Sequence, residues 1–225
     1  MRDHGVEIFI FSSTCATYGN PQYVPIDEQH PQNPINPYGA SKLMLERVLA
    51  DYSHAYGLKY AALRYFNAAG CSEDGKIGED HNPETHLIPL VLEAAAGTRP
   101  EITIFGVDYD TPDGSCIRDY IHVNDLARAH ILAISKLEAG AESFQCNLGT
   151  GIGHSVKSLI AAAEKVTGLS IPMKIGERRA GDPAELVAAP GRAKTLLGWE
   201  AEIKDLETIL QTAWAWISGP RKGHY

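Results

Sequence analysis

The chain has 225 residues, of which 44% are hydrophobic and 21% are charged, and its formal net charge is −8. This is the composition of a globular protein that can bury a core without disulfide bonds. The acidic balance argues against binding to nucleic acid or to anionic membranes, because both require basic surfaces. Apolar runs stay below the ~18 residues of a membrane span, and the four scattered cysteines suit buried thiols, so we expect a cytoplasmic protein.

The first third of the chain is predicted to form a strand, a helix and a second strand. The apolar run at 6–13 is typical of a buried strand. Residues 38–56 carry apolar side chains at close to a 3.6-residue period, and Gly57 is a suitable helix end. Residues 59–70 form the second predicted strand. This order indicates a βαβ unit, and therefore a parallel sheet.

Strands and helices continue to alternate through the rest of the chain. An extended segment begins at Arg118 and should become a helix near Asn124 or Asp125, either of which could cap it. The other predicted elements are a helix at 85–96, a strand at 101–106, a strand at 142–150, a helix at 155–168, a strand at 171–177, and helices at 190–198 and 204–218. The fold class is therefore α/β.

Two patterns that resemble binding motifs are incomplete. "GTGIGHS" (149–155) follows a strand and precedes a helix, but His154 stands where a dinucleotide fingerprint needs its third glycine. A plain strand-to-helix turn is expected there. His81 and His86 flank a loop without other ligands nearby, so no metal site is predicted.

"NPYGASK" places Tyr38 and Lys42 four residues apart, on one face of a helix near its start. A tyrosine has a reference pKa of about 10 and is a poor base at neutral pH, but a nearby ammonium favours the phenolate. Ser12, Ser13 and Thr14 end the preceding strand with hydroxyl groups. Together these groups could take a proton from an alcohol while a hydride leaves its carbon. The spacing alone is weak, since it also arises by chance.

Longer motifs cover essentially the whole chain: "FSSTCATYG", "NPYGASK", "LRYFNAAG", "HLIP", "TIFGVDYDTPDGSCIRDYIHVNDLARAH", "NLGTGIGHSV" and "RRAGDPAELVA". In this order they resemble the extended short-chain dehydrogenase/reductase superfamily and, within it, the UDP-glucose 4-epimerases. The resemblance implies a Rossmann-type parallel sheet, of which this chain holds the C-terminal part, plus a smaller α/β substrate-binding domain. The implied domains are 1–67 with the catalytic pair and 68–225 for the nucleotide sugar, with 123–155 returning to the Rossmann sheet.

The resemblance also implies roles for individual residues. Tyr38 would be the catalytic base and acid, Lys42 would lower its pKa and bind the cofactor ribose, and Thr14 would face the sugar 4-hydroxyl. Tyr65 and Phe66 would lie along the cofactor. The residues implied for the nucleotide sugar are Asn67 on the diphosphate, His86, Leu87, Thr103, Ile104 and Phe105 around the uridine, Arg118 and Arg179 as a diphosphate clamp, Asp182 on the uridine ribose, and Leu186 at the sugar pocket. From the residues themselves, the adjacent Arg178 and Arg179 indicate a local anion site in an acidic chain.

The implied reaction interconverts UDP-galactose and UDP-glucose by epimerisation at C4 through a 4-keto sugar, with transient hydride transfer to NAD. The alternatives are a UDP-N-acetylhexosamine 4-epimerase or another nucleotide-sugar dehydrogenase, and a non-catalytic fragment that binds a UDP-sugar only. Leu186 is intermediate in size and leaves acetylated sugars open. A homodimer is possible, because the family pairs through helices that resemble 38–56.

The sequence departs from the family at its beginning. The G-x-x-G-x-x-G turn that holds the NAD phosphates in the family does not occur in these 225 residues. We therefore expect weak NAD binding by this chain, as for a truncated copy or fragment, and an exposed sheet edge at 6–11.

Overall fold

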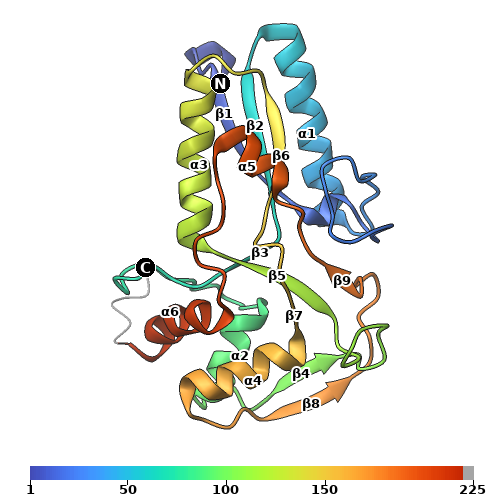
Figure 1. Cartoon of the computed structure of the whole chain (residues 1–225), viewed down its shortest axis with the longest axis vertical. Helices are drawn as coiled ribbons and strands as arrows, with labels where there is room; N and C mark the ends of the chain where they lie inside the picture. Colours follow the sequence, from blue (N-terminus) through green and yellow to red (C-terminus); the bar gives the residue numbers. More distant parts are fainter. Residues whose placement is uncertain (220–225) are drawn as a thin grey trace.

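The computed structural model describes residues 1–219. Its α-helices and strands alternate along the chain, as expected for the α/β class (Figure 1). The elements are η1 (Arg2–His4), β1 (Ile8–Thr14), η2 (Cys15–Thr17), α1 (Pro37–Tyr56), β2 (Lys59–Tyr65), β3 (Asn67–Ala69), α2 (Leu87–Ala95), β4 (Ile102–Phe105), β5 (Ile117–His122), α3 (Val123–Glu138), β6 (Phe144–Leu148), β7 (Gly153–Ser155), α4 (Val156–Thr167), β8 (Met173–Gly176), β9 (Glu185–Leu186), α5 (Gly191–Leu197) and α6 (Leu206–Ser218).

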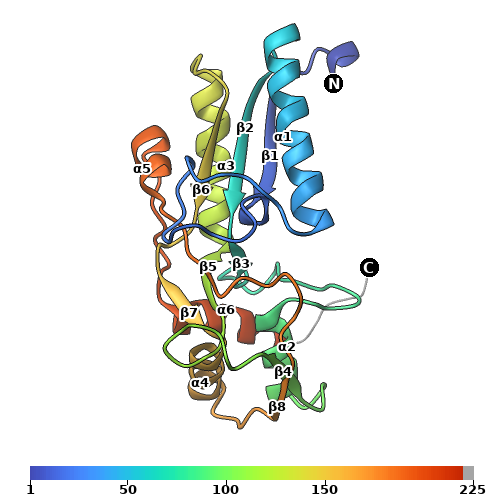
Figure 2. The same ribbon diagram turned by 90° about the vertical axis from the view of Figure 1, so that its right-hand side faces the viewer.

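A three-stranded parallel sheet with the order β1-β2-β6 forms one end of the molecule. Helices cover both of its faces, with α1 on one side and α3 on the other (Figure 2). The alternation of side chains along β2 explains this layering: Tyr60 and Ala62 pack in the cluster of Leu49 from α1, whereas Ala61 and Leu63 pack in the cluster that contains residues of α3. The sheet is therefore buried on both faces, as in a Rossmann-type fold.

The other end of the molecule holds a four-stranded sheet, a two-stranded sheet and the largest core. β5 pairs with β3, β7 and β9, and β4 pairs with β8 in a parallel two-stranded sheet. α2, α4 and α6 pack against one another there. The division of the chain into domains stays a prediction, although β6 does pair with β2 in the first sheet.

The predicted strand at 59–70 is divided in two at Phe66. β2 ends at Tyr65, and β3 begins at Asn67 in another sheet, where Asn67 pairs with Tyr120. The backbone N–H of Phe66 still donates to the Leu148 carbonyl at 3.3 Å, so the chain leaves the first sheet at this residue. This crossing places Asn67 at the junction of the two ends of the molecule.

Two further local predictions are wrong. Neither Asn124 nor Asp125 caps α3: the cap is His122, whose Nδ1 accepts the Asn124 N–H at 3.1 Å. The segment 149–155 is more than a turn, because Gly153–Ser155 pairs with β5 as β7. Among the described residues, helices with the length and apolar character of a membrane span are absent.

Candidate active site

The start of α1 lies against the carboxyl end of β1. The Asn36 side chain caps the helix by accepting the Gly39 N–H at 2.8 Å, and Pro37 occupies its first turn. Gly39 is needed for the close approach, because a Cβ there would lie 2.3 Å from the carbonyl oxygen of Ala16. The absence of that side chain lets the preceding residue in the helix, Tyr38, approach Thr14 at the end of β1.

Tyr38 and Lys42 share the face of α1 that is turned to β1. The Lys42 ammonium donates to the Ser12 carbonyl at 2.9 Å and lies 5.6 Å from the centre of the Tyr38 ring. Thr14, at the end of β1, is close enough to Tyr38 to lower the pKa of its phenol. Tyr38 is nevertheless 55% exposed, so a ligand can reach its hydroxyl.

The pKa of Tyr38 is raised in the protein alone. Burial of part of the ring raises it, the Thr14 hydrogen bond lowers it, and the nearby Tyr65 and Cys15 raise it further. This net direction is opposite to the lowering that the sequence predicted from Lys42. The physical reason is that the Lys42 ammonium is directed to the Ser12 carbonyl and not to the phenol.

A cavity of about 400 Å³ lies beyond Asn67, between β4, β5 and the amino end of α2. It is large enough for a small ligand and opens to solvent. The predicted substrate residues that line it are Asn67, His86, Leu87, Thr103, Phe105, Arg118, Arg179 and Asp182. These residues come from five separate parts of the chain, and the fold brings them together around one cavity.

Three arginines line the cavity, namely Arg99, Arg118 and Arg179, and the last two have different surroundings. Arg118 is 9% exposed and forms an ion pair with Asp182. The guanidinium of Arg179 lies 3.9 Å from the centre of the Phe105 ring. Arg178 instead pairs with Asp108 at 2.7 Å and lies over Tyr109, outside the cavity. The predicted anion site of two adjacent arginines is therefore wrong, since only Arg179 of that pair faces the cavity.

Three other predicted residues lie elsewhere. Ile104 is 3% exposed in the hydrophobic core, because alternate residues of β4 point to opposite sides. Phe66 is buried in a cluster with Cys15 and Tyr18, and Leu186 packs against that same cluster from β9. Phe66 and Leu186 are therefore packing residues between the end of β1 and the cavity.

Sequence reasoning missed several residues of the cavity wall. They are Thr85, Leu90, Arg99, Glu101, Ile102, Cys116, Tyr120 and Val156. Thr85 and Ile102 had an available signal, since they directly precede His86 and Thr103. The others face the cavity because of how α2, β5, α4 and the segment before β4 pack, and no local pattern reports that.

Tyr38 and the cavity are connected through the end of β2. Thr14 pairs with Tyr65 in the parallel register, and Asn67 follows two residues later. Two residues of extended chain span about 7 Å. A ligand seated in the cavity can therefore extend past Asn67 to the hydroxyls of Thr14 and Tyr38.

A parallel sheet covered on both faces, with a Tyr–Lys pair at the carboxyl ends of its strands, defines the short-chain dehydrogenase/reductase class. The model of the NAD dependent epimerase/dehydratase family matches residues 1–149. The chain belongs to this family.

Curated relatives are similar in sequence over nearly the whole chain. It is 51% identical over 224 residues to UDP-glucose 4-epimerase of Streptococcus mutans, covering 100% of this chain and 67% of the relative. UDP-glucose 4-epimerase of Halalkalibacterium halodurans is 53% identical over 216 residues, covering 96% of this chain and 65% of the relative.

Solved structures of UDP-glucose 4-epimerases also resemble this chain in fold and sequence. A crystal structure of a UDP-glucose 4-epimerase superposes with a TM-score of 0.95 at 50% identity, covering 100% of this chain and 68% of that one. The UDP-glucose 4-epimerase of Brucella ovis in complex with NAD superposes with a TM-score of 0.90 at 53% identity, covering 92% of this chain and 64% of that one. The chain thus spans about two thirds of the length of the proteins that it matches.

The residues present fit one end of the family's cofactor. Tyr38 and Lys42 present a hydroxyl and an ammonium at the carboxyl end of a parallel sheet, where nucleotides bind in open α/β folds. Tyr65 ends β2 beside them. These groups suit the ribose and nicotinamide end of NAD. The glycine-rich turn that suits its phosphates is not found within the 225 residues.

Proposed function

We propose that this chain supplies the acid–base pair and the nucleotide-sugar pocket for the interconversion of UDP-galactose and UDP-glucose at C4. The observation that carries the proposal is the placement of Tyr38, Lys42 and Thr14 at the carboxyl end of β1, beside a cavity lined by Arg99, Arg118 and Arg179. The relatives named UDP-glucose 4-epimerase support it, as does a Bifidobacterium longum enzyme solved with NAD⁺ and UDP, which is 41% identical with a TM-score of 0.91.

The pocket residues would hold the nucleotide and leave the sugar free to turn. Arg179 would bind the diphosphate together with Asn67, and Asp182 would accept a hydrogen bond from the ribose once it separates from Arg118. The uridine would lie near Leu87 and Phe105. Rotation about the diphosphate link would then present either face of the sugar to the same catalytic groups.

Tyr38 would hold and move the proton. As the phenolate it would take the proton from O4 as C4 becomes a ketone, and as the neutral phenol it would return that proton in the second half of the reaction, while the Thr14 hydroxyl would bond O4. NAD, held by Tyr38 and Lys42, would supply the acceptor and donor for the hydride of C4. The 4-keto sugar is therefore the intermediate, and the tyrosine must act in turn as base and acid.

The range of sugars stays a prediction. Leu186 packs on the cluster that contains Phe66, near the predicted sugar position. A branched side chain of this size would leave space for hexoses and for some acetylated sugars. A Campylobacter jejuni UDP-Glc/GlcNAc 4-epimerase that is 46% identical, with a TM-score of 0.79, favours including UDP-N-acetylglucosamine as a test substrate.

A second candidate function is binding of a UDP-sugar without turnover. The lack of a glycine-rich turn within these residues favours it. Turnover of UDP-galactose to UDP-glucose with added NAD⁺ would establish the epimerase. Binding of UDP in calorimetry, with neither turnover nor NAD⁺ binding, would establish the binding-only function. A chain that binds neither UDP nor UDP-galactose would contradict both.

We also propose that two copies pair through α1 and that the protein works in the cytoplasm. The exposed apolar side chains Met44, Leu45, Val48 and Tyr52 support the pairing, since they extend along one helix. The reduced state of the four cysteines is compatible with the location.

A further inference from the structure

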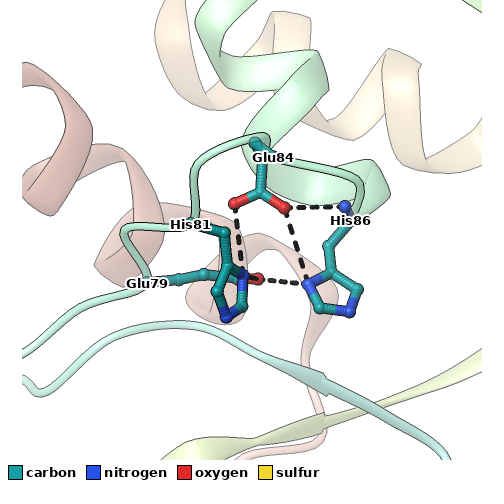
Figure 3. Close-up of side chains that lie close together, drawn as sticks. All are labelled: Glu79, His81, Glu84 and His86. Carbon is teal, nitrogen blue, oxygen red and sulfur yellow. Dashed lines mark hydrogen bonds and ion pairs between the residues drawn. The ribbon is translucent and has the colours of Figure 1, made fainter.

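Four side chains converge in the loop between β3 and α2. Glu79, His81, Glu84 and His86 point toward a common centre, as Figure 3 shows. One nitrogen or oxygen atom from each lies within 4.8 Å of the corresponding atoms of the other three. The sequence prediction that the two histidines have no other ligands nearby is therefore wrong.

The spacing of these atoms suits one metal ion. His81 Nδ1 is 3.0 Å from Glu79 Oε1 and 3.7 Å from Glu84 Oε2, and His86 Nδ1 is 3.5 Å from Glu84 Oε1. His86 Nδ1 also contacts Glu79 Oε1. Ligands of a tetrahedral zinc ion at about 2.0–2.1 Å from the metal lie about 3.3–3.4 Å from one another. The donors need only small movements to surround an ion.

The surrounding structure fixes the loop. The Glu84 side chain is 6% exposed, and its Oε1 accepts the backbone N–H groups of Thr85 and His86 at 2.6 and 2.7 Å. The Glu79 carbonyl accepts Nε1 of Trp216 from α6 at 2.9 Å. Both histidine side chains are 57% exposed. The site thus combines the held carboxylate of Glu84 and the held backbone of Glu79 with an open path for an ion.

The donor types select the class of ion. Imidazole nitrogens suit zinc and similar transition metals, whereas magnesium and calcium prefer oxygen ligands alone. Two carboxylates balance the charge of a divalent ion when both histidines are neutral. We propose that Glu79, His81, Glu84 and His86 bind one zinc-class divalent ion. Four protein ligands make this a structural site, because no position is left for a reacting water.

Binding there would fix one wall of the cavity. Thr85, His86 and Leu87 line that cavity. His86 is itself one of the four ligands, and Thr85 and Leu87 are its neighbours in the chain. The bound ion would hold this segment in place at the start of α2. This consequence rests on the proposed function of the cavity, whereas binding of the ion does not.

The test is calorimetric titration of the untagged, chelator-treated chain with zinc chloride, in the absence of nucleotide and NAD⁺. We expect one equivalent to bind, and the cobalt-loaded chain to show the visible absorption of a tetrahedral site. His81→Ala and Glu79→Gln should each weaken binding at least about tenfold. Glu73→Gln, an exposed carboxylate in the same loop, is the matched control and should change nothing.

Circular dichroism of each variant separates loss of the site from loss of the fold. The proposal would be overturned if the wild-type chain bound no zinc, or if folded Glu79→Gln bound it with unchanged affinity. In that case the cluster would be a pair of histidine–carboxylate ion pairs. Because UDP is left out, failure of this test is distinguishable from failure of the proposed function.

Discussion

Arg178 and Arg179 are adjacent in the sequence but have different partners. Arg179 stacks on Phe105 in the cavity wall, while Arg178 pairs with Asp108 outside it. A planar guanidinium can stack and form two parallel hydrogen bonds to a phosphate, and an ammonium cannot. We therefore expect Arg179→Lys to weaken UDP binding by roughly tenfold, or about 1.4 kcal/mol, as measured by calorimetry.

Arg178→Lys is the matched control for this substitution. It preserves the charge, lies one residue away and should leave UDP affinity within about twofold, because it removes no cavity contact. Equal losses in the two variants would show that general charge, and not the position of Arg179, governs binding.

The Tyr38–Lys42 pair illustrates which features of a site the sequence reveals and which it does not. Tyr38, Lys42 and Thr14 were found from spacing and from the resemblance. Their contacts were not: Lys42 bonds a backbone carbonyl, and the pKa of Tyr38 is raised. For the proposed metal ligands Glu79, His81, Glu84 and His86 the opposite holds, because the sequence contained a signal that our prediction did not use. Glu79 and Glu84 stand two residues before His81 and His86, so the pattern E-x-H-x-x-E-x-H was visible in the sequence.

At the scale of elements, a buried ion pair holds α1 to the first sheet. Arg64 of β2 and Glu46 of α1 are paired, with side chains 4% and 8% exposed. Arg64 also donates to the hydroxyl of Tyr18 at 3.0 Å, and Ser13 donates to Glu46 at 2.5 Å. This network joins α1, which carries Tyr38 and Lys42, to the ends of β1 and β2.

Removing one charge of this pair should be costly. Glu46→Gln leaves the Arg64 guanidinium buried without a counter-charge, so we expect a loss of about 3 kcal/mol in the free energy of unfolding, measured with urea. Glu138→Gln, an exposed glutamate on α3, should change it by less than about 0.5 kcal/mol. A similar small loss for Glu46→Gln would show that the pair contributes little.

The pH dependence of that loss follows from the pKa of Glu46. Burial raises this pKa, but the hydrogen bond and charge of Arg64, with Ser13 and Gln32, hold it below its ordinary value of 4.5. A lowered folded-state pKa stabilises the protein above the ordinary value and loses this effect as the pH falls below it. The difference between wild type and Glu46→Gln should therefore shrink in acid.

The long elements were predictable and the short ones were not. α1 is close to its predicted range because a 3.6-residue apolar period, Asn36, Pro37 and Gly57 all indicate the same helix. β7 and β9 have three and two residues, and each exists because it pairs with β5. Such pairing depends on distant parts of the chain and leaves no local period to detect.

At the scale of the whole molecule, the cavity joins segments that are far apart in the sequence. Asn67, the start of α2, β4, β5 and the segment around Asp182 all contribute to it. A ligand that contacts all of them binds only the folded chain. UDP at about 100 times its dissociation constant should stabilise the fold by about 2.7 kcal/mol, which raises Tm by roughly 5–10 °C.

Thermal unfolding with UDP measures this directly, and uridine at the same concentration is the control for the diphosphate contacts. A Tm that did not move with UDP, although the chain was folded, would show that the cavity is not a nucleotide site.

The central claim is that Tyr38 moves the proton at O4 of a sugar held by the cavity. The most direct measurement is turnover of UDP-galactose with added NAD⁺, comparing wild type, Tyr38→Phe and Tyr52→Phe, a control on the same helix. We predict that Tyr38→Phe lowers kcat by about 10²- to 10⁴-fold and leaves UDP affinity unchanged. Tyr52→Phe should leave both kcat and UDP affinity at their wild-type values. Turnover by Tyr38→Phe at the wild-type rate would contradict the claim.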